Sequence, residues 1–132
     1  MRIGPVSTVA AVTLFGAAAS ASDVRILSFP DSVRGTWAPS ADACKGSAPG
    51  KVEIAAKTHS TADQSCEISW ITVTPSRDGP VYSARSMCTR TKTGKKLEPS
   101  YLVVTPRPDN KLLVRMPFAK PDAQLVTYQK CS

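Results

Sequence analysis

Residues 66–91 read CEISWITVTPSRDGPVYSARSMCTRT, and this stretch predicts one long antiparallel hairpin. Both arms, residues 66–74 and 81–91, are rich in β-branched and aromatic residues, which favour strands. The PSRDGP segment between them is typical of a turn, because Pro fixes φ and Gly tolerates positive φ. The turn centres near residues 77 and 78, so we expect Cys66 and Cys88 to lie opposite each other.

Further strands are predicted on both sides of this hairpin, at residues 33–38, 51–57, 101–105, 111–118 and 124–131. The clearest period-two pattern is in the run 111–118, and Leu113 alone interrupts it. It places Leu112, Val114, Met116 and Phe118 on one face and Lys111 and Arg115 on the other. Turns are expected at residues 106–110 and at Thr93-Gly94, and residues 39–43 suit a single helical turn.

The strands predict an all-β fold of six to eight strands with antiparallel, meander-like connections. An open sheet of this size exposes its edges, so we expect a small barrel or a two-sheet sandwich. Residues 33–132 form a single β domain in this interpretation, preceded by an irregular N-terminal arm at 22–32 in which Pro30 excludes a regular ladder. The polar stretch 58–65 is interpreted as a loop.

Four cysteines, Cys44, Cys66, Cys88 and Cys131, predict two disulfides that staple the domain. Hairpin geometry favours Cys66–Cys88. Cys44 follows the first strand and Cys131 ends the last, and these two strands would pair in a barrel, which favours Cys44–Cys131. The sequential pairing Cys44–Cys66 with Cys88–Cys131 is the alternative.

The first 21 residues predict a signal peptide. Met1-Arg2 is a positive start, residues 6–18 are a short apolar run, and Ala19-Ser20-Ala21 is a small-x-small cleavage site. The apolar run is too short for a transmembrane anchor. We therefore expect a mature chain that begins at Ser22, keeps 111 of the 132 residues, and is periplasmic or secreted.

The chain is basic, with 17 Lys and Arg against 10 Asp and Glu and a formal net charge of +7, or +6 once Arg2 is removed with the signal. This excess favours acidic partners such as lipid head groups or acidic polysaccharides, although net charge also serves solubility. The densest cluster is Arg90, Lys92, Lys95 and Lys96 around Thr93-Gly94. Such a cluster is typical of an ordinary solvated turn; contact of these four cations with an anionic surface is the alternative. Nucleic acid is not expected, because aromatics do not alternate with the basic residues along the sequence.

The sequence is poor in groups for catalysis or metal binding. His59 is the only histidine, and its polar neighbours predict an exposed loop position. No Gly-x-Ser-x-Gly elbow is present, and cysteine separations of 22, 22 and 43 residues do not resemble Cys-x-x-Cys metal pairs. Carboxylates that meet in space, among Glu53, Glu67 and Glu98, would be the remaining route to hydrolysis. We expect no enzyme activity, no catalytic residue, no metal and no cofactor.

Gly35-Thr36-Trp37 on the first predicted strand resembles the Gly-x-Trp motif of lipocalin-like barrels. That resemblance implies that Trp37 plugs one end of a barrel. Both Trp37 and Trp70 are expected to be core aromatics, because each buries a large apolar surface.

The same region resembles exported bacterial inhibitors of serralysin-type metalloproteases, which carry a short arm, a Gly-x-Trp and a nearby cysteine. Here these features are Ser22, Asp23, Val24 and Arg25, followed by Gly35-x-Trp37 and Cys44. The resemblance implies that residues 22–25 enter a protease cleft. That family typically makes one disulfide, whereas this chain has four cysteines. The whole chain also resembles many short, uncharacterised exported proteins of Gram-negative bacteria.

Together these features predict a non-enzymatic exported β-barrel that acts as a binding or envelope-associated module of unknown ligand. The alternative is a periplasmic protease inhibitor that acts through its N-terminal arm. The expected partner is an anionic envelope component in the first case and an exported protease in the second.

Overall fold

A computed structural model describes residues 4, 23–45, 50–116 and 124–131 of the chain. The predicted signal peptide, Gly4 apart, and the predicted new N-terminus at Ser22 lie outside the described residues.

The described residues form nine β-strands and one short 3₁₀ helix. The helix, η1 (Asp42–Cys44), overlaps the single helical turn expected at residues 39–43. The strands are β1 (Val24–Ile26), β2 (Gly35–Ala38), β3 (Val52–Ile54), β4 (Thr58–Ser60), β5 (Gln64–Thr74), β6 (Val81–Arg90), β7 (Ser100–Arg107), β8 (Lys111–Met116) and β9 (Gln124–Lys130).

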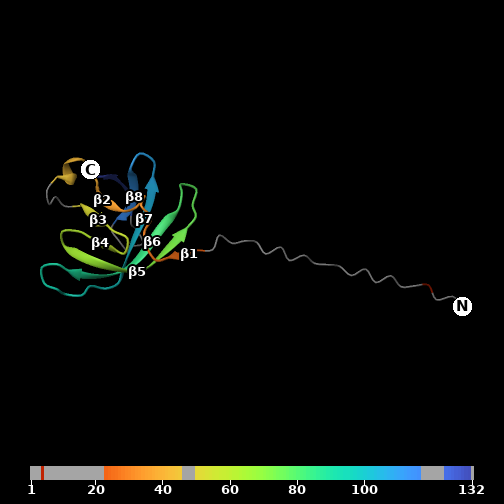
Figure 1. Cartoon of the computed structure of the whole chain (residues 1–132), viewed down its shortest axis with the longest axis horizontal. Coiled ribbons are helices and arrows are strands. Elements are labelled where there is room, and N and C mark those ends of the chain that lie inside the picture. The colour runs from red at the N-terminus through yellow and green to blue at the C-terminus, as the bar shows by residue number, and fades with distance from the viewer. Residues whose placement is uncertain (1–3, 5–22, 46–49, 117–123, 132) are drawn as a thin grey trace.

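Strands β2 to β9 form a closed antiparallel barrel, in which each strand pairs with the next along the chain (Figure 1). The pairing of β2 with β9, at Trp37↔Lys130 and Ala38↔Gln129, closes it. The all-β prediction is confirmed, and of its two architectures the barrel is the one found. Closure removes the exposed edges that an open sheet would have.

The hairpin of residues 66–91 is confirmed as β5 and β6, which pair from Gln64↔Arg90 to Thr74↔Val81 with an irregularity between Ile68 and Trp70. β5 is longer than its neighbour β4, which pairs only with residues 65–67. β1 occupies the rest of that edge, with Val24↔Val73, Arg25↔Thr72 and Ile26↔Ile71. The prediction of an irregular arm is therefore wrong for β1, because the long β5 offers it an unpaired edge.

The core fills the inside of the barrel and includes the face predicted from alternation. Leu112 and Val114 are 0% and 1% exposed, while Arg115 is exposed; the side chains of Met116 and Phe118 lie outside the described part. The buried cluster consists of Phe29, Val33, Trp37, Val52, Ile54, Ile71, Ala84, Leu102, Val104, Leu112, Val114 and Tyr128.

Both predicted disulfides are present with the predicted pairing. Cys66–Cys88 joins two directly opposed residues of β5 and β6, and Cys44–Cys131 joins η1 to the residue after β9. In the chain-entropy model, the separations of 22 and 87 residues correspond to roughly 3 and 4–5 kcal/mol of stabilisation. The second bond reinforces the β2–β9 closure.

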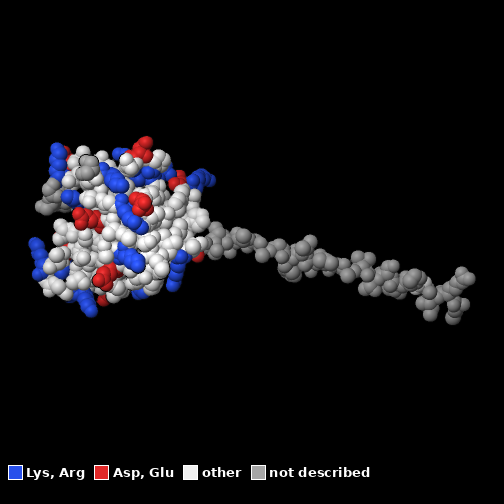
Figure 2. Space-filling view, in the orientation of Figure 1, with Lys and Arg blue, Asp and Glu red and all other residues white. Residues whose placement is uncertain are grey.

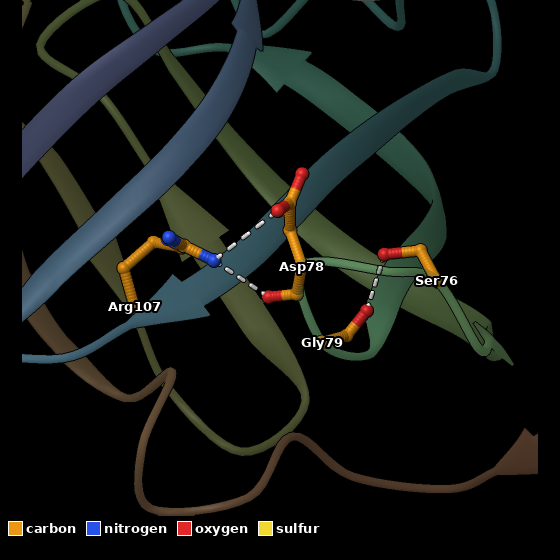
Figure 3. A network of polar contacts seen from close by, with 4 residues as sticks. All are labelled: Ser76, Asp78, Gly79 and Arg107. Carbon is orange, nitrogen blue, oxygen red and sulfur yellow. Dashed lines mark hydrogen bonds and ion pairs between the residues drawn. The ribbon is translucent and has the colours of Figure 1, made fainter.

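One end of the barrel is tied together at the β5–β6 turn (Figure 3). The Nη1 group of Arg107, at the end of β7, donates a hydrogen bond to the Asp78 carbonyl at 2.8 Å and lies 3.8 Å from the Asp78 carboxylate. Within the turn, Ser76 Oγ donates to the carbonyl of Gly79, whose φ is 113°. Arg107 thus has a carboxylate partner at this end of the barrel.

Candidate functional site

The four predicted surface cations lie at the opposite end of β6, on a closed hairpin tip. The Gly94 amide donates to the Arg90 carbonyl at 2.8 Å, and the Arg90 amide donates to the Lys95 carbonyl at 2.9 Å. Gly94 adopts φ of 69°, a conformation that favours Gly. The turn expected at Thr93-Gly94 is confirmed, and it brings these cations to one tip, which we call the basic hairpin (Arg90, Lys92, Lys95 and Lys96).

All four side chains of the basic hairpin are exposed, and none has an ion-pair partner in the described part of the chain. The ion pairs found among those residues are Arg34–Asp31 and Arg107–Asp78. Figure 2 shows several Lys and Arg side chains projecting at the lower left, where Figure 1 places the β6–β7 connection, with acidic groups beside them and over the middle of that face. The positive charge is therefore concentrated at this tip without a direct ion pair to any described residue, while Glu67 lines the same pocket as Lys96 and the Asp63 carbonyl accepts a hydrogen bond from the Thr91 amide.

A second cationic feature, on the outer wall of the barrel, is one that the sequence analysis missed. Trp70 is half-buried there, with the Arg25 guanidinium 4.8 Å and the Arg85 guanidinium 4.7 Å from its ring centroid. The prediction that Trp70 is a core aromatic is wrong, because the bulge between Ile68 and Trp70 shifts the alternation and turns this ring outward. We call Arg25, Trp70 and Arg85 the Arg–Trp–Arg stack.

The predicted inhibitory arm is held against the barrel where it is described. Ser22 lies outside the described residues, and Asp23 Oδ1 accepts a hydrogen bond from Thr74 Oγ1 at 2.8 Å. Val24 and Arg25 belong to β1 and are paired with β5. Their backbone is therefore engaged in the sheet rather than extended into solvent.

His59 is not an exposed loop residue, contrary to the prediction. It is 3% exposed on β4, where it points inward between two residues that face outward. Its Nε2 atom lies 2.7 Å from the hydroxyl of Ser86, which is itself fully buried. Burial lowers the pKa of His59 from 6.5 to about 4, because desolvation disfavours the charged imidazolium. The polar neighbours of His59 predict exposure, but Ser86 supplies a hydrogen-bond partner inside the barrel, so the imidazole can be buried there.

The distance between His59 and Ser86 is that of a catalytic base and its nucleophile, but the pair lacks the solvent access and, among the described residues, the carboxylate of a catalytic site. Both residues are inside the barrel, and in the described part of the chain no carboxylate contacts His59. The ligand atoms of His59, Cys66 and Cys88 lie within 4.8 Å of one another. Because the two sulfurs are bonded to each other, neither offers the thiolate that binds metals.

The remaining sequence candidates are dispersed. Glu53 lies on β3, Glu67 on β5 and Glu98 beyond the basic hairpin; all three are exposed, and no contact joins them in the described part. Trp37 is a core aromatic as predicted, 1% exposed, with its Nε1 donating to the Val33 carbonyl at 2.8 Å.

Comparison with protein-family models, with curated proteins and with solved structures finds no match. None of the helical structure in the described residues has the length and apolar character that crossing a membrane requires.

Proposed function

We propose that this protein is a non-enzymatic, exported binding module that docks on an anionic component of the cell envelope. The observation that carries the proposal is the basic hairpin, whose four exposed cations lack carboxylate partners among the described residues. Closely spaced charges of one sign raise the local concentration of opposite charge and speed encounter. The feature that distinguishes the hairpin is the number of cations at one tip, because the turn at the other end of β6 contains a single cation, Arg77.

Three further observations support this proposal over the alternatives. Two disulfides are compatible with an oxidising compartment outside the cytoplasm. The Ser86 hydroxyl and His59 imidazole are buried, which argues against their acting on an external substrate. Inhibition through the N-terminal arm would require Val24 and Arg25 to leave their pairing with β5.

The test is co-sedimentation of the mature protein with anionic vesicles and with purified envelope polysaccharide across a salt series. Binding should weaken as salt rises, because exposed charges are screened over roughly 8–10 Å at ordinary ionic strength. The variant Arg90→Gln, Lys92→Gln, Lys95→Gln, Lys96→Gln should lose binding and keep its fold, since exposed substitutions usually shift stability by about 0.5 kcal/mol or less.

A matched control neutralises four cations away from the basic hairpin, Lys45, Arg77, Lys111 and Arg115, by the same Gln substitutions. It has the same net charge as the hairpin variant, so it separates a local site from overall charge. Equal loss in both variants, or no binding at low salt, would reject the basic hairpin as the docking site.

A further inference from the structure

The Arg–Trp–Arg stack holds two cations in fixed positions without neutralising them. Trp70 pairs directly with Arg85 across β5 and β6, and Arg25 pairs with Thr72, two residues along β5. The indole ring thus contacts a guanidinium from the strand on each side of β5. Cation–π contact orders a guanidinium while leaving its N–H edges available for hydrogen bonds.

Neither guanidinium of the stack has a carboxylate partner in the described part of the chain. Arg carries a planar fork of donors that matches the two oxygens of a carboxylate, and such pairs are frequently bidentate. Side chains that are already ordered lose less entropy when a ligand binds. The stack is therefore preorganised for planar anionic groups.

An open pocket of about 370 Å³ lies on the same wall, between the stack and the basic hairpin. Its lining consists of Ser65, Glu67, Met87, Cys88, Thr89 and Lys96. The hydroxyls of Ser65 and Thr89 and the carboxylate of Glu67 are suitable partners for ligand hydroxyl groups.

These features form a continuous line along β6. Arg85 is followed along β6 by Met87 and then by Thr89. Thr89 in turn pairs with Lys96 of the basic hairpin. At about 3.4 Å per residue, Arg85 and Thr89 are roughly 14 Å apart along the strand. We define the outer-wall strip as the Arg–Trp–Arg stack, this pocket and Lys96. Along it, a cationic section is followed by a section that can bind hydroxyl groups and then by a second cation. This length suits an extended ligand.

We infer that the outer-wall strip binds an acidic polysaccharide, with Arg25 and Arg85 holding sugar carboxylates and the pocket holding sugar hydroxyls. This inference rests on the proposed function, because it names the ligand class of an anion-docking module. Its site includes residues of β1, β5 and β6 that the basic hairpin does not contain.

The probes are an oligogalacturonate, uncharged dextran, anionic phosphatidylglycerol vesicles and a single-stranded oligonucleotide. Titration calorimetry should show binding to the oligogalacturonate, with weaker or no binding to the other three. The Arg25→Gln, Arg85→Gln variant should have an affinity for the oligogalacturonate that is lower by about tenfold or more, because each substitution removes a charge-assisted hydrogen bond to the ligand. The matched control Arg77→Gln, Arg115→Gln should change affinity by less than about twofold, since both residues lie away from the strip.

Intrinsic fluorescence gives a second readout, because Trp70 lies in the stack and Trp37 in the core. Oligogalacturonate should change the emission of the native protein, and Trp70→Phe should abolish that change. Unchanged affinity in the Arg25→Gln, Arg85→Gln variant would overturn the inference, and so would tighter binding of vesicles or oligonucleotide. If vesicles bind through the basic hairpin and the oligogalacturonate does not, this inference fails alone; if no anionic probe binds, the proposed function fails with it.

Discussion

Trp37 and Trp70 both lie beside cations, but one fills the inside of the barrel and the other lies on its outer wall. Trp37 is 1% exposed, its indole N–H bonds the Val33 carbonyl, and Lys130 Nζ is 5.8 Å from its ring centroid. Trp70 is half-buried and is flanked by Arg25 and Arg85 at 4.8 and 4.7 Å.

The difference shows how the same residue type serves two purposes. The position of Trp37 is determined by close packing, so its removal leaves a cavity. The position of Trp70 is determined by cation–π contacts at the surface, each worth about 0.5–1 kcal/mol when exposed. Substitutions inside the barrel should therefore chiefly lower the free energy of unfolding, whereas substitutions on the outer wall should chiefly lower the affinity for a ligand.

The largest effect that tests this comparison is removal of each ring. Trp37→Ala should destabilise the fold by about 3–5 kcal/mol, because it empties a packed interior position. Trp70→Ala should cost less, about 1–2 kcal/mol, because the ring lies on the outer wall, where its loss removes two surface contacts and empties no enclosed position. Denaturant unfolding of both variants measures this. Equal losses would show that the outer ring is structural after all.

A pH effect of intermediate size tests the interior further. His59 has a pKa of about 4 when folded and 6.5 when unfolded, so between these values the unfolded chain takes up a proton that the folded chain does not. The unfolding free energy should therefore fall as pH drops from 6.5 to 4, by about 3 kcal/mol from this group.

Comparison with His59→Gln isolates this contribution, because Gln can still hydrogen-bond Ser86 and does not titrate. Both proteins keep the same carboxylates, so the difference between their pH–stability curves belongs to His59. Parallel curves from pH 7 to 4 would mean that the imidazole titrates normally in the fold.

The smallest expected effect lies at Gly35, where the chain enters the strand that carries Trp37. Gly35 adopts φ of 136°, and an added Cβ would lie 2.9 Å from Lys130 Cε. Gly35→Ala should cost about 1–2 kcal/mol, chiefly from the backbone conformation, and should displace Lys130 from the Trp37 ring. Thermal unfolding measures the cost; Gly79→Ala, also at positive φ (113°) but with open space at its Cβ, is the control for backbone strain alone.

Much of the fold could be predicted from the sequence because it depends on local patterns. Alternation at residues 111–115 gave the correct inward face, and turn residues bounded β5 and β6. The pairing Cys66–Cys88 followed from counting outward from one turn, and Cys44–Cys131 from the need of a barrel to join its first and last strands.

The errors concern features that depend on distant residues. β4 is a polar triplet whose one buried side chain, His59, is satisfied by a serine 27 residues away. β1 is a strand only because β5 extends past β4. A bulge beside Trp70 inverts the side to which its ring points, and its two cationic neighbours come from different strands. A basic hairpin is visible in one stretch of sequence, whereas a stack built across three strands is not.

The β2–β9 seam has a consequence for the order of assembly. Synthesis proceeds from the N-terminus, so β2 to β8 are all made before β9 exists to join Trp37 to Lys130. Until β9 pairs with β2 and β8, any sheet of β2 to β8 has two unpaired edges, the condition that invites intermolecular pairing. The β5–β6 hairpin rests on contacts close in sequence and can form early, whereas closure brings together distant segments and is intrinsically slower. Pairing of β9 is therefore the step that closes the barrel, and the protein is most prone to aggregate before that step.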